Sequence, residues 1–342
     1  MYQFEGHRGI PPVSFAERQI DAMEGVLGFD TSCYTTSIAA ASRDGSILCS
    51  ERIVLPVEDG KRGLRQNEAV FAHVRQLPIV MTRLEAVGRE IRICAIAAAS
   101  GPKDDEESYM PVFIVGLCFA QAMASAMRIP LYKFSHQQGH IAAGQIDNTL
   151  TDGAFIALHL SGGTTEMLLC DRDAPRLLGG TMDLHAGQLM DRVGVAMGLP
   201  FPAGPAMERL AAGCRVPSQA LLPVSLTGGD LRCHLSGAEA KCLRWVQSGE
   251  LSPEKIALEV FDFLARTITR LLAAGCRETR LRQALIVGGV ASADLLRRLV
   301  AERMAKHRLG REVRVVFGKA KYSGDNGAGI ARLGVYKHWG IS

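Results

Sequence analysis

Two histidines four positions apart are the residues of this sequence best suited to chemistry. His136 and His140 follow a short apolar segment, residues 130–132, and no proline separates them. If the segment opens a helix, positions i and i+4 lie on one face, with Cβ atoms about 5–6 Å apart. Two imidazoles placed in this way can bind one metal ion. Ordinary histidines at a helix start show the same spacing, so a metal site needs a further ligand.

Asp325 is the candidate third ligand. It lies in the turn 323–328, just before the predicted C-terminal helix. A carboxylate is also favoured at a helix N-terminus, so capping of that helix is the simpler interpretation of Asp325. The sequence leaves both interpretations open.

Glycine-rich turns follow two predicted apolar strands. The turn 161–164 comes after residues 154–160, and Gly288 and Gly289 come after residues 284–287. Glycine lets a backbone approach a ligand closely, and such turns hold phosphates, although each is a weak signal alone. A hydroxyl-rich turn at 31–36 precedes the turn 161–164 by about 130 residues in a similar strand–turn–strand pattern. The recurrence predicts two related halves with a nucleotide between them.

Alternating short apolar runs and amphipathic segments supply the elements around these turns. Strands are predicted at residues 26–30, 37–41, 47–55, 93–99, 130–132, 154–160, 167–170, 177–181, 284–287 and 313–317, the first three as an antiparallel meander. Helices are predicted at 66–87, 110–127, 183–197, 205–212, 238–247, 253–276, from about 292 and at the C-terminus. Pro78 lies inside the first helix and allows a kink. His73, in the same helix, is predicted to be structural.

The composition fits a globular α/β protein of more than one core. The chain has 342 residues, 47% of them hydrophobic, and a formal charge of +4, too small an excess to indicate nucleic-acid binding by itself. The nine cysteines include no CxxC pair, which suits reduced thiols better than a disulfide framework. The longest apolar run, near residues 112–127 and interrupted by Gln121, falls short of the ~20 residues of a membrane span. Residues 1–24 are expected to form a loose extension, and Met23 is an equally suitable start.

Together these motifs resemble the TsaD/Gcp family of threonylcarbamoyl transferases, formerly called O-sialoglycoprotein endopeptidases. The resemblance runs from about residue 26 to 336. It is carried by segments 27–33, 136–140, 160–165, 183–205, 235–237, 288–290 and 325–328. It implies a two-lobed α/β fold like those of actin, sugar kinases and heat-shock chaperone ATPases, with duplicated ribonuclease H-like domains and a central nucleotide cleft. Lobe I would comprise residues 25–134, completed by the C-terminal helix 324–342, and lobe II residues 135–323.

The resemblance also implies roles for single residues. His136, His140 and Asp325 would hold one divalent metal, iron or zinc, and an ATP or adenylate would occupy the cleft. The residues implied to contact nucleotide or substrate are Ser161, Gly162, Gly163, Thr164, Asp191, Gly204, Gly288 and Gly289. The reaction would pass a threonylcarbamoyl group from an adenylate to adenosine in tRNA.

Several positions depart from the family pattern. Tyr34 and Thr35 stand where the family has Asp-Glu, and we take them as the catalytic positions, although neither is an anionic base at neutral pH. Thr164 replaces a histidine and Ala293 an asparagine, and residues 103–107 replace a glycine-rich loop. These departures indicate a divergent paralogue.

Two other functions remain open from the sequence. The scaffold also suits an ATPase, a small-molecule kinase or another carbamoyltransferase, with Asp30 or Asp191 as base, or a non-catalytic nucleotide-binding partner subunit. Peptidase activity has no support, because the His-x-x-x-His segment lacks the glutamate of His-Glu-x-x-His. The expected partners are tRNA, a homologous dimerisation subunit and an adenylate-forming enzyme, in the cytoplasm and without a membrane.

Overall fold

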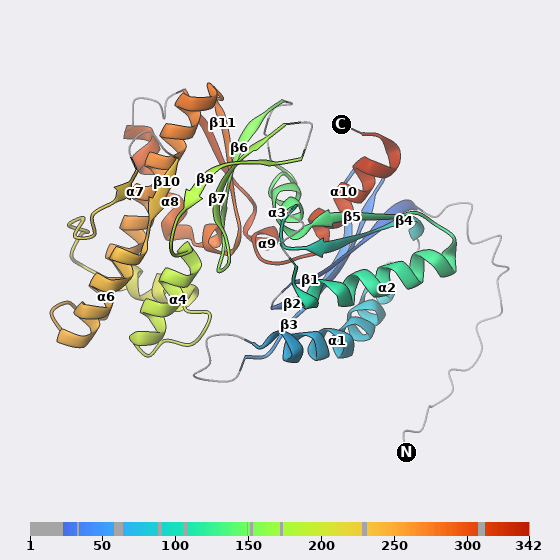
Figure 1. Ribbon diagram of the computed structural model, residues 1–342, viewed down its shortest axis with the longest axis horizontal. Helices are drawn as coiled ribbons and strands as arrows, with labels where there is room; N and C mark the ends of the chain where they lie inside the picture. The colour runs from blue at the N-terminus through green and yellow to red at the C-terminus, as the bar shows by residue number, and fades with distance from the viewer. Residues whose placement is uncertain are drawn as a thin grey trace, which may run out of the picture.

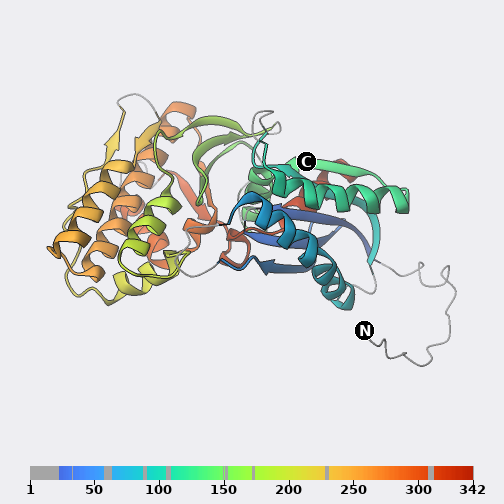
Figure 2. The same ribbon diagram turned by 60° about the horizontal axis from the view of Figure 1, so that its bottom comes forward.

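The fold consists of two β-sheets side by side, each covered by helices (Figure 1). The computed structural model describes residues 23–341 except 33, 58–63, 88–90, 105–108, 149, 151–152, 172–173, 228–230 and 307–311. The predicted extension therefore lies, but for its last two residues, outside the described part. Figure 2 shows the two halves from a second direction, joined by segments at their centre.

The first sheet has the strand order β3-β2-β1-β4-β5. Its strands are β1 (Met23–Ser32), β2 (Thr35–Ser42), β3 (Ile47–Val54), β4 (Ile91–Gly101) and β5 (Leu131–Ser135). The first three pair antiparallel, which confirms the predicted meander, and β4 and β5 continue the sheet in parallel.

The second sheet repeats this order. Its strands are β6 (Phe155–Leu160), β7 (Thr165–Cys170), β8 (Arg176–Thr181), β9 (Ser225–Leu226), β10 (Arg232–His234), β11 (Gln283–Val287) and β12 (Arg314–Phe317). Read from β8 through β7, β6 and β11 to β12, it has the same antiparallel and parallel pairings as the first sheet. The two halves are therefore related, as the recurring pattern predicted, and β10 and β9 extend the second sheet.

Helices cover both faces of the first sheet. Leu27 and Phe29 of β1 pack with α1 (Gln66–Val87) and α2 (Pro111–Met127), while Val26 packs with α10 (Ala328–Trp339) on the opposite face. Successive strand residues face opposite sides, so a strand covered twice must be apolar throughout. This explains the unbroken apolar run in β1. The division into lobes at residues 25–134 and 135–323 remains a proposal.

The remaining helices build the second half and the junction. They are α3 (His136–Gly144), α4 (Ala186–Ala196), α5 (Gly204–Gly213), α6 (Ser236–Ser248), α7 (Pro253–Thr279), α8 (Asp294–Lys306) and α9 (Ala320–Ser323). α3 touches α10 from the first half and β6 and β11 from the second. In the described part of the chain, no helix has the length and apolar character that a membrane crossing requires.

Some predicted bounds differ from the structure. α1 continues through Pro78 as one helix. α4 begins at Ala186 rather than 183, because Asp183 instead accepts hydrogen bonds from the backbone of Leu184 and Leu235. After Gly288 a short 3₁₀ turn, Gly289–Ser292, precedes α8.

Candidate metal centre and nucleotide cleft

The first turn of α3 carries both candidate histidine ligands. Ser135 caps the helix by accepting a hydrogen bond from the backbone N–H of Gln138, and the Gln138 side chain returns a bond to the Ser135 N–H. This capping box fixes the helix start at His136. His140 follows one turn later on the same face, as the sequence predicted, and is buried.

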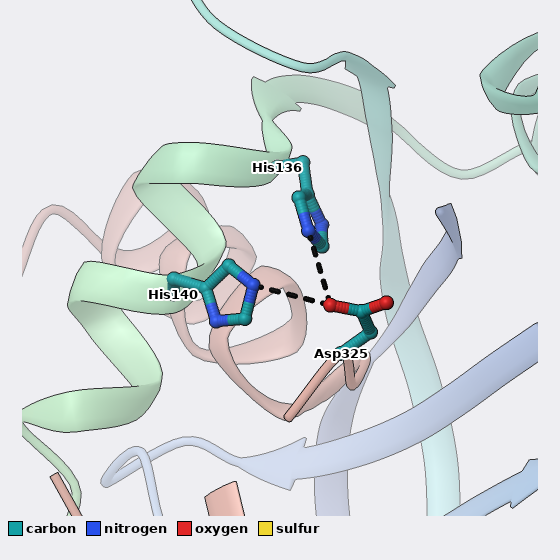
Figure 3. Close-up of side chains that lie close together, drawn as sticks. All are labelled: His136, His140 and Asp325. Carbon is teal, nitrogen blue, oxygen red and sulfur yellow. Dashed lines mark ion pairs between the residues drawn. The ribbon is translucent and has the colours of Figure 1, made fainter. Parts of the chain in front are cut away.

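Asp325 reaches these two imidazoles from the opposite end of the chain (Figure 3). Its Oδ1 lies 3.5 Å from Nε2 of His136 and 3.3 Å from Nε2 of His140. Ligand bonds of about 2.0–2.1 Å at tetrahedral angles place neighbouring ligand atoms about 3.3–3.4 Å apart. His140 Nε2 is buried and makes no hydrogen bond within the described residues, despite its ion-pair distance to Asp325. All three ligand atoms lie within 4.8 Å of one another, so the three side chains can share one cation.

The capping interpretation of Asp325 does not hold in the structure. Asn326, the next residue, accepts the hydrogen bond from the backbone N–H of Ala328, the first residue of α10. Ser37 of β2 binds the N–H of Gly327. The turn is thus fixed by its neighbours, and the Asp325 carboxylate is turned toward the histidines.

Asp30 supports the site from behind. At the end of β1, its Oδ2 accepts a hydrogen bond of 2.7 Å from Nδ1 of His136. That bond keeps the proton on Nδ1 and directs Nε2 toward Asp325. Although burial lowers the pKa of His136, the Asp30 and Asp325 carboxylates raise it to about 10. Burial tends to raise the pKa of Asp325, but the two histidines hold it well below its usual range.

We predict that Asp30→Asn weakens metal binding by about 10–100-fold, because it removes the charge behind a ligand while preserving shape. Equilibrium dialysis with Zn²⁺ measures the effect. Asp44→Asn, in an exposed turn, is the matched control and should bind like the unchanged protein. Equal affinity of Asp30→Asn and the control would show that Asp30 does not support the ligand.

Two glycines bring the ligand-bearing segments together. Gly139 of α3 faces Gly329 of α10, and a Cβ added to Gly329 would lie 1.8 Å from the Gly139 carbonyl oxygen. No side chain fits between these two helices at this point. Because His140 follows Gly139 and α10 begins just after Asp325, this crossing sets how closely the ligands approach.

The glycine turns lie beside this centre. β6 and β11 are parallel neighbours, so turn 161–164 and the turn at Gly288 leave the same sheet edge. Gly288 has φ +98, and a Cβ there would lie 2.3 Å from the Leu160 carbonyl oxygen. Gly162, Gly163 and Gly289 have nothing within 4 Å of an added Cβ, and Gly162 and Gly163 are exposed. This edge leaves open backbone for a ligand.

The other predicted site residues lie in the second half of the molecule. Ser161 and Thr164 close their turn by a backbone hydrogen bond of 2.8 Å. Asp191, on α4, accepts a hydrogen bond from the N–H of Ala203, next to Gly204 at the start of α5. Asp191 and Gly204 thus share one helix corner, and their ribose and adenine roles remain proposals.

The two positions taken as catalytic have different surroundings. Thr35 is buried at the start of β2. The ring of Tyr34 lies edge-on to Phe201 of the second half, 5.8 Å between centroids. His73 is structural as predicted, because its ring binds the Ser32 carbonyl and the Thr36 hydroxyl.

Sequence reasoning missed three features of the site. Asp30 was considered only as a kinase base, and its place behind His136 follows from the folded sheet. A second polar cluster ties α3 to β7: Gln137 donates to Glu166, and Lys103 pairs with the same carboxylate. His159 was included in an apolar strand, although it follows Phe155 and Ala157 on the α3-facing side of β6. That period-2 alternation was the available signal.

Two sheets with the same strand order and pairing define the class of this protein, the actin-like ATPase and sugar kinase fold. HypF of T. kodakarensis superposes with a TM-score of 0.61 at 13% identity, covering 93% of this chain and 48% of HypF. This chain therefore spans about half the length of HypF. The activator of the 2-hydroxyisocaproyl-CoA dehydratase from Clostridium difficile, solved with bound ADPNP, superposes with a TM-score of 0.51 at 13% identity, covering 92% and 96%. The fold class predicted from the sequence is confirmed.

The family follows from sequence comparison. Residues 60–332 match the TsaD family, described as tRNA N6-adenosine threonylcarbamoyltransferase. The transferase of that name from Bordetella petrii is 32% identical over 319 residues, covering 90% of this chain and 88% of the relative. The one from Pelodictyon phaeoclathratiforme is 29% identical over 342 residues, covering 91% and 92%. The chain belongs to the TsaD family.

Proposed function

We propose that this protein transfers a threonylcarbamoyl group from an adenylate to adenosine in tRNA, with a divalent metal held by His136, His140 and Asp325. The observation that carries the proposal is the meeting of these three side chains beside the glycine turns of the second sheet. Family membership supports the transferase class, because its relatives are named as tRNA threonylcarbamoyltransferases. A tRNA substrate would place the protein in the cytoplasm.

Residues from both halves of the molecule would bind and orient the substrate. A divalent ion would act as a Lewis acid on the carbamoyl carbonyl. Ser161, Gly162 and Gly163 would receive the phosphate, because their backbone is open to a ligand there. The corner of Asp191 and Gly204 would hold ribose and adenine. Asp30 holds the His136 ring in position.

Tyr34 is proposed to position substrate rather than to remove a proton. It lies where its ring spans from the first half to Phe201 of the second. A phenol has a usual pKa of about 10, which makes it a poor base at neutral pH. Thr35 is buried, so the acceptor would meet Tyr34 first.

A kinase or ATPase is the alternative on this scaffold, and the surroundings of Asp30 disfavour it. A kinase base must accept a proton from an attacking hydroxyl. Asp30 is 1% exposed and already accepts a hydrogen bond from His136. Asp191 likewise accepts one from the Ala203 backbone.

The test is a reconstituted transfer assay with the purified protein, threonine, bicarbonate, ATP, the adenylate-forming enzyme and tRNA. We expect modified adenosine that disappears after chelation and returns with zinc or iron. ATP turnover without modified adenosine would instead support the ATPase. Modification that is unaffected by complete metal removal would contradict the metal-dependent mechanism.

A homologous subunit is the proposed protein partner, and the outer face of α1 and α2 is its proposed contact surface. Phe71 and Val74 are 73% and 47% exposed there. The apolar groove between the helices is lined by Val70, Val74, Pro111, Ile114, Val115, Cys118 and Phe119. An apolar patch of this kind marks an interaction surface more often than free surface.

Phe71→Glu is expected to prevent association with such a subunit, because it places a charge on the exposed apolar side of α1, three residues before Val74 of the groove. Light scattering after gel filtration of the mixed proteins measures complex formation. Leu177→Glu, an equally apolar exposed position on β8, should leave it unchanged. A complex of normal stability with Phe71→Glu would place the contact elsewhere.

A further inference from the structure

Glu166 on β7 accepts contacts from two side chains outside its own sheet. Nε2 of Gln137 donates a hydrogen bond of 2.7 Å to its Oε2, and the Lys103 ammonium pairs with its Oε1. The Glu166 and Lys103 side chains are 15% and 33% exposed, so the pair is partly shielded from solvent. A shielded ion pair that also accepts a hydrogen bond holds its segments more firmly than an exposed pair does. The proposed reaction gives none of these three residues a role.

The three side chains come from both halves of the molecule. Lys103 follows β4 of the first sheet by two residues, whereas Glu166 is the second residue of β7 in the second sheet. Gln137 is the second residue of α3, and its backbone N–H donates a hydrogen bond of 3.0 Å to the Pro102 carbonyl. The segment after β4 and the start of α3 are therefore joined to each other, and both are fastened to β7 through one carboxylate.

Glu166 also lies between the proposed phosphate turn and the candidate metal ligands. Turn 161–164 ends two residues before Glu166, and Gln137 directly follows the candidate ligand His136. The connection from the turn to His136 therefore runs through Glu166 and Gln137, with a single hydrogen bond between them.

The pairing of β6 with β7 shows how the first turn of α3 is aligned on the second sheet. Glu166 is directly opposite His159 in the antiparallel register, so both side chains project from the same face. The His159 ring lies 4.7 Å from that of His140, between centroids, while Gln137 contacts Glu166. Because Gln137 and His140 are three positions apart on one side of the helix, the turn is held against the sheet at two points.

We propose that Glu166 is a positioning residue for the transfer reaction. Through Lys103 and Gln137 it sets the distance between the phosphate turn 161–164 and the metal centre. An adenylate must contact both sites at once, and a misplacement of about 1 Å costs about 100-fold in rate. The inference rests on the proposed function, which supplies the metal centre and the phosphate site.

Phosphorus NMR of AMP bound to the cobalt-loaded protein tests this role, because a paramagnetic ion speeds the relaxation of a ³¹P nucleus more strongly the closer it lies. We expect a clear enhancement in the wild-type protein and its loss in Glu166→Ala. The affinities for Co²⁺ and for AMP, each measured alone by dialysis, should stay near the wild-type values, while threonylcarbamoyl transfer falls about 100-fold. Glu239→Ala is the matched control, since its carboxylate is similarly shielded, at 16% exposed, but pairs with Arg192 inside the second half.

Reversing the charges of the pair distinguishes positioning from a local folding defect. Lys103→Glu alone places two like charges together and should lose the relaxation enhancement. Combined with Glu166→Lys, it should recover most of the enhancement, because the ion pair forms again and the Gln137 amide oxygen accepts a hydrogen bond from the ammonium. Unchanged enhancement and transfer in Glu166→Ala, or slower transfer with unchanged enhancement, would overturn the positioning role.

The wild-type measurements separate this inference from the proposed function. Wild-type protein that binds neither cobalt nor AMP contradicts the proposed function. Wild-type protein that binds both, but shows the same enhancement as Glu166→Ala, contradicts only the positioning role of Glu166.

Discussion

Asp325→Ala is expected to abolish retention of the metal and to lower threonylcarbamoyl transfer on the order of 10³-fold. Without the Lewis acid, the transition state loses several kcal/mol of stabilisation. Each 1.36 kcal/mol corresponds to a tenfold change in rate. Asp325 Oδ1 lies within 3.5 Å of both histidine nitrogens. Among the described residues of the three-member set, Asp325 is the one carboxylate, so its removal leaves only the two imidazoles. Metal content by plasma mass spectrometry, together with modified adenosine per tRNA, measures the two effects.

The control for Asp325→Ala is Asp147→Ala. Asp147 is an exposed carboxylate that pairs with Lys319 and Lys321 on the surface. Such surface pairs contribute little, so metal content and transfer should stay at the unchanged level. If Asp325→Ala retained the metal at full stoichiometry, Asp325 would not be a ligand.

Gly329→Ala is expected to damage both stability and the site. The added Cβ would lie 1.8 Å from the backbone of Gly139, which cannot move without shifting α3. Overpacking of this kind costs about 1–3 kcal/mol, and more where backbone must move. Because α3 carries His136 and His140, the same shift should separate them from Asp325 and weaken metal binding. Urea denaturation and zinc dialysis on one preparation measure both.

Gly237→Ala provides the comparison, because it adds the same methyl group in α6 where nothing lies within 4 Å. Replacing a helical glycine by alanine without a clash should raise the free energy of unfolding by about 0.5–1 kcal/mol. A decrease in the free energy of unfolding for Gly329→Ala and an increase for Gly237→Ala would confirm the close helix crossing. Gly329→Ala with normal stability and normal zinc affinity would show that α3 and α10 tolerate a wider separation.

The sequence predicts local features of this protein well. The meander at the start, the helix opening at His136 and the recurring glycine turns depend on residue patterns within a few positions, such as the Ser135 cap and the apolar run of β1. Residue type and spacing made His136, His140 and Asp325 candidate ligands, and the family resemblance assigned them to one metal. The close approach of these three side chains depends on the crossing of α3 and α10, where Gly139 meets Gly329, about 190 positions away in the sequence.

The features that sequence reasoning missed are contacts between distant segments. Asp30 and His136 meet because β1 and α3 both reach the same sheet edge. His159 alternates with Phe155 and Ala157 along β6, but a single histidine in an apolar strand shows no partner in the sequence. Asn326 rather than Asp325 binds the α10 backbone, because both residue types cap helices and only the folded turn selects between them.

Anomalous diffraction from crystals of the protein loaded with zinc tests the central claim most directly. The account predicts one strong peak within about 2.0–2.2 Å of Nε2 of His136, Nε2 of His140 and Oδ1 of Asp325. No peak between these three atoms in a fully loaded crystal, or a peak bound by other side chains, would contradict it.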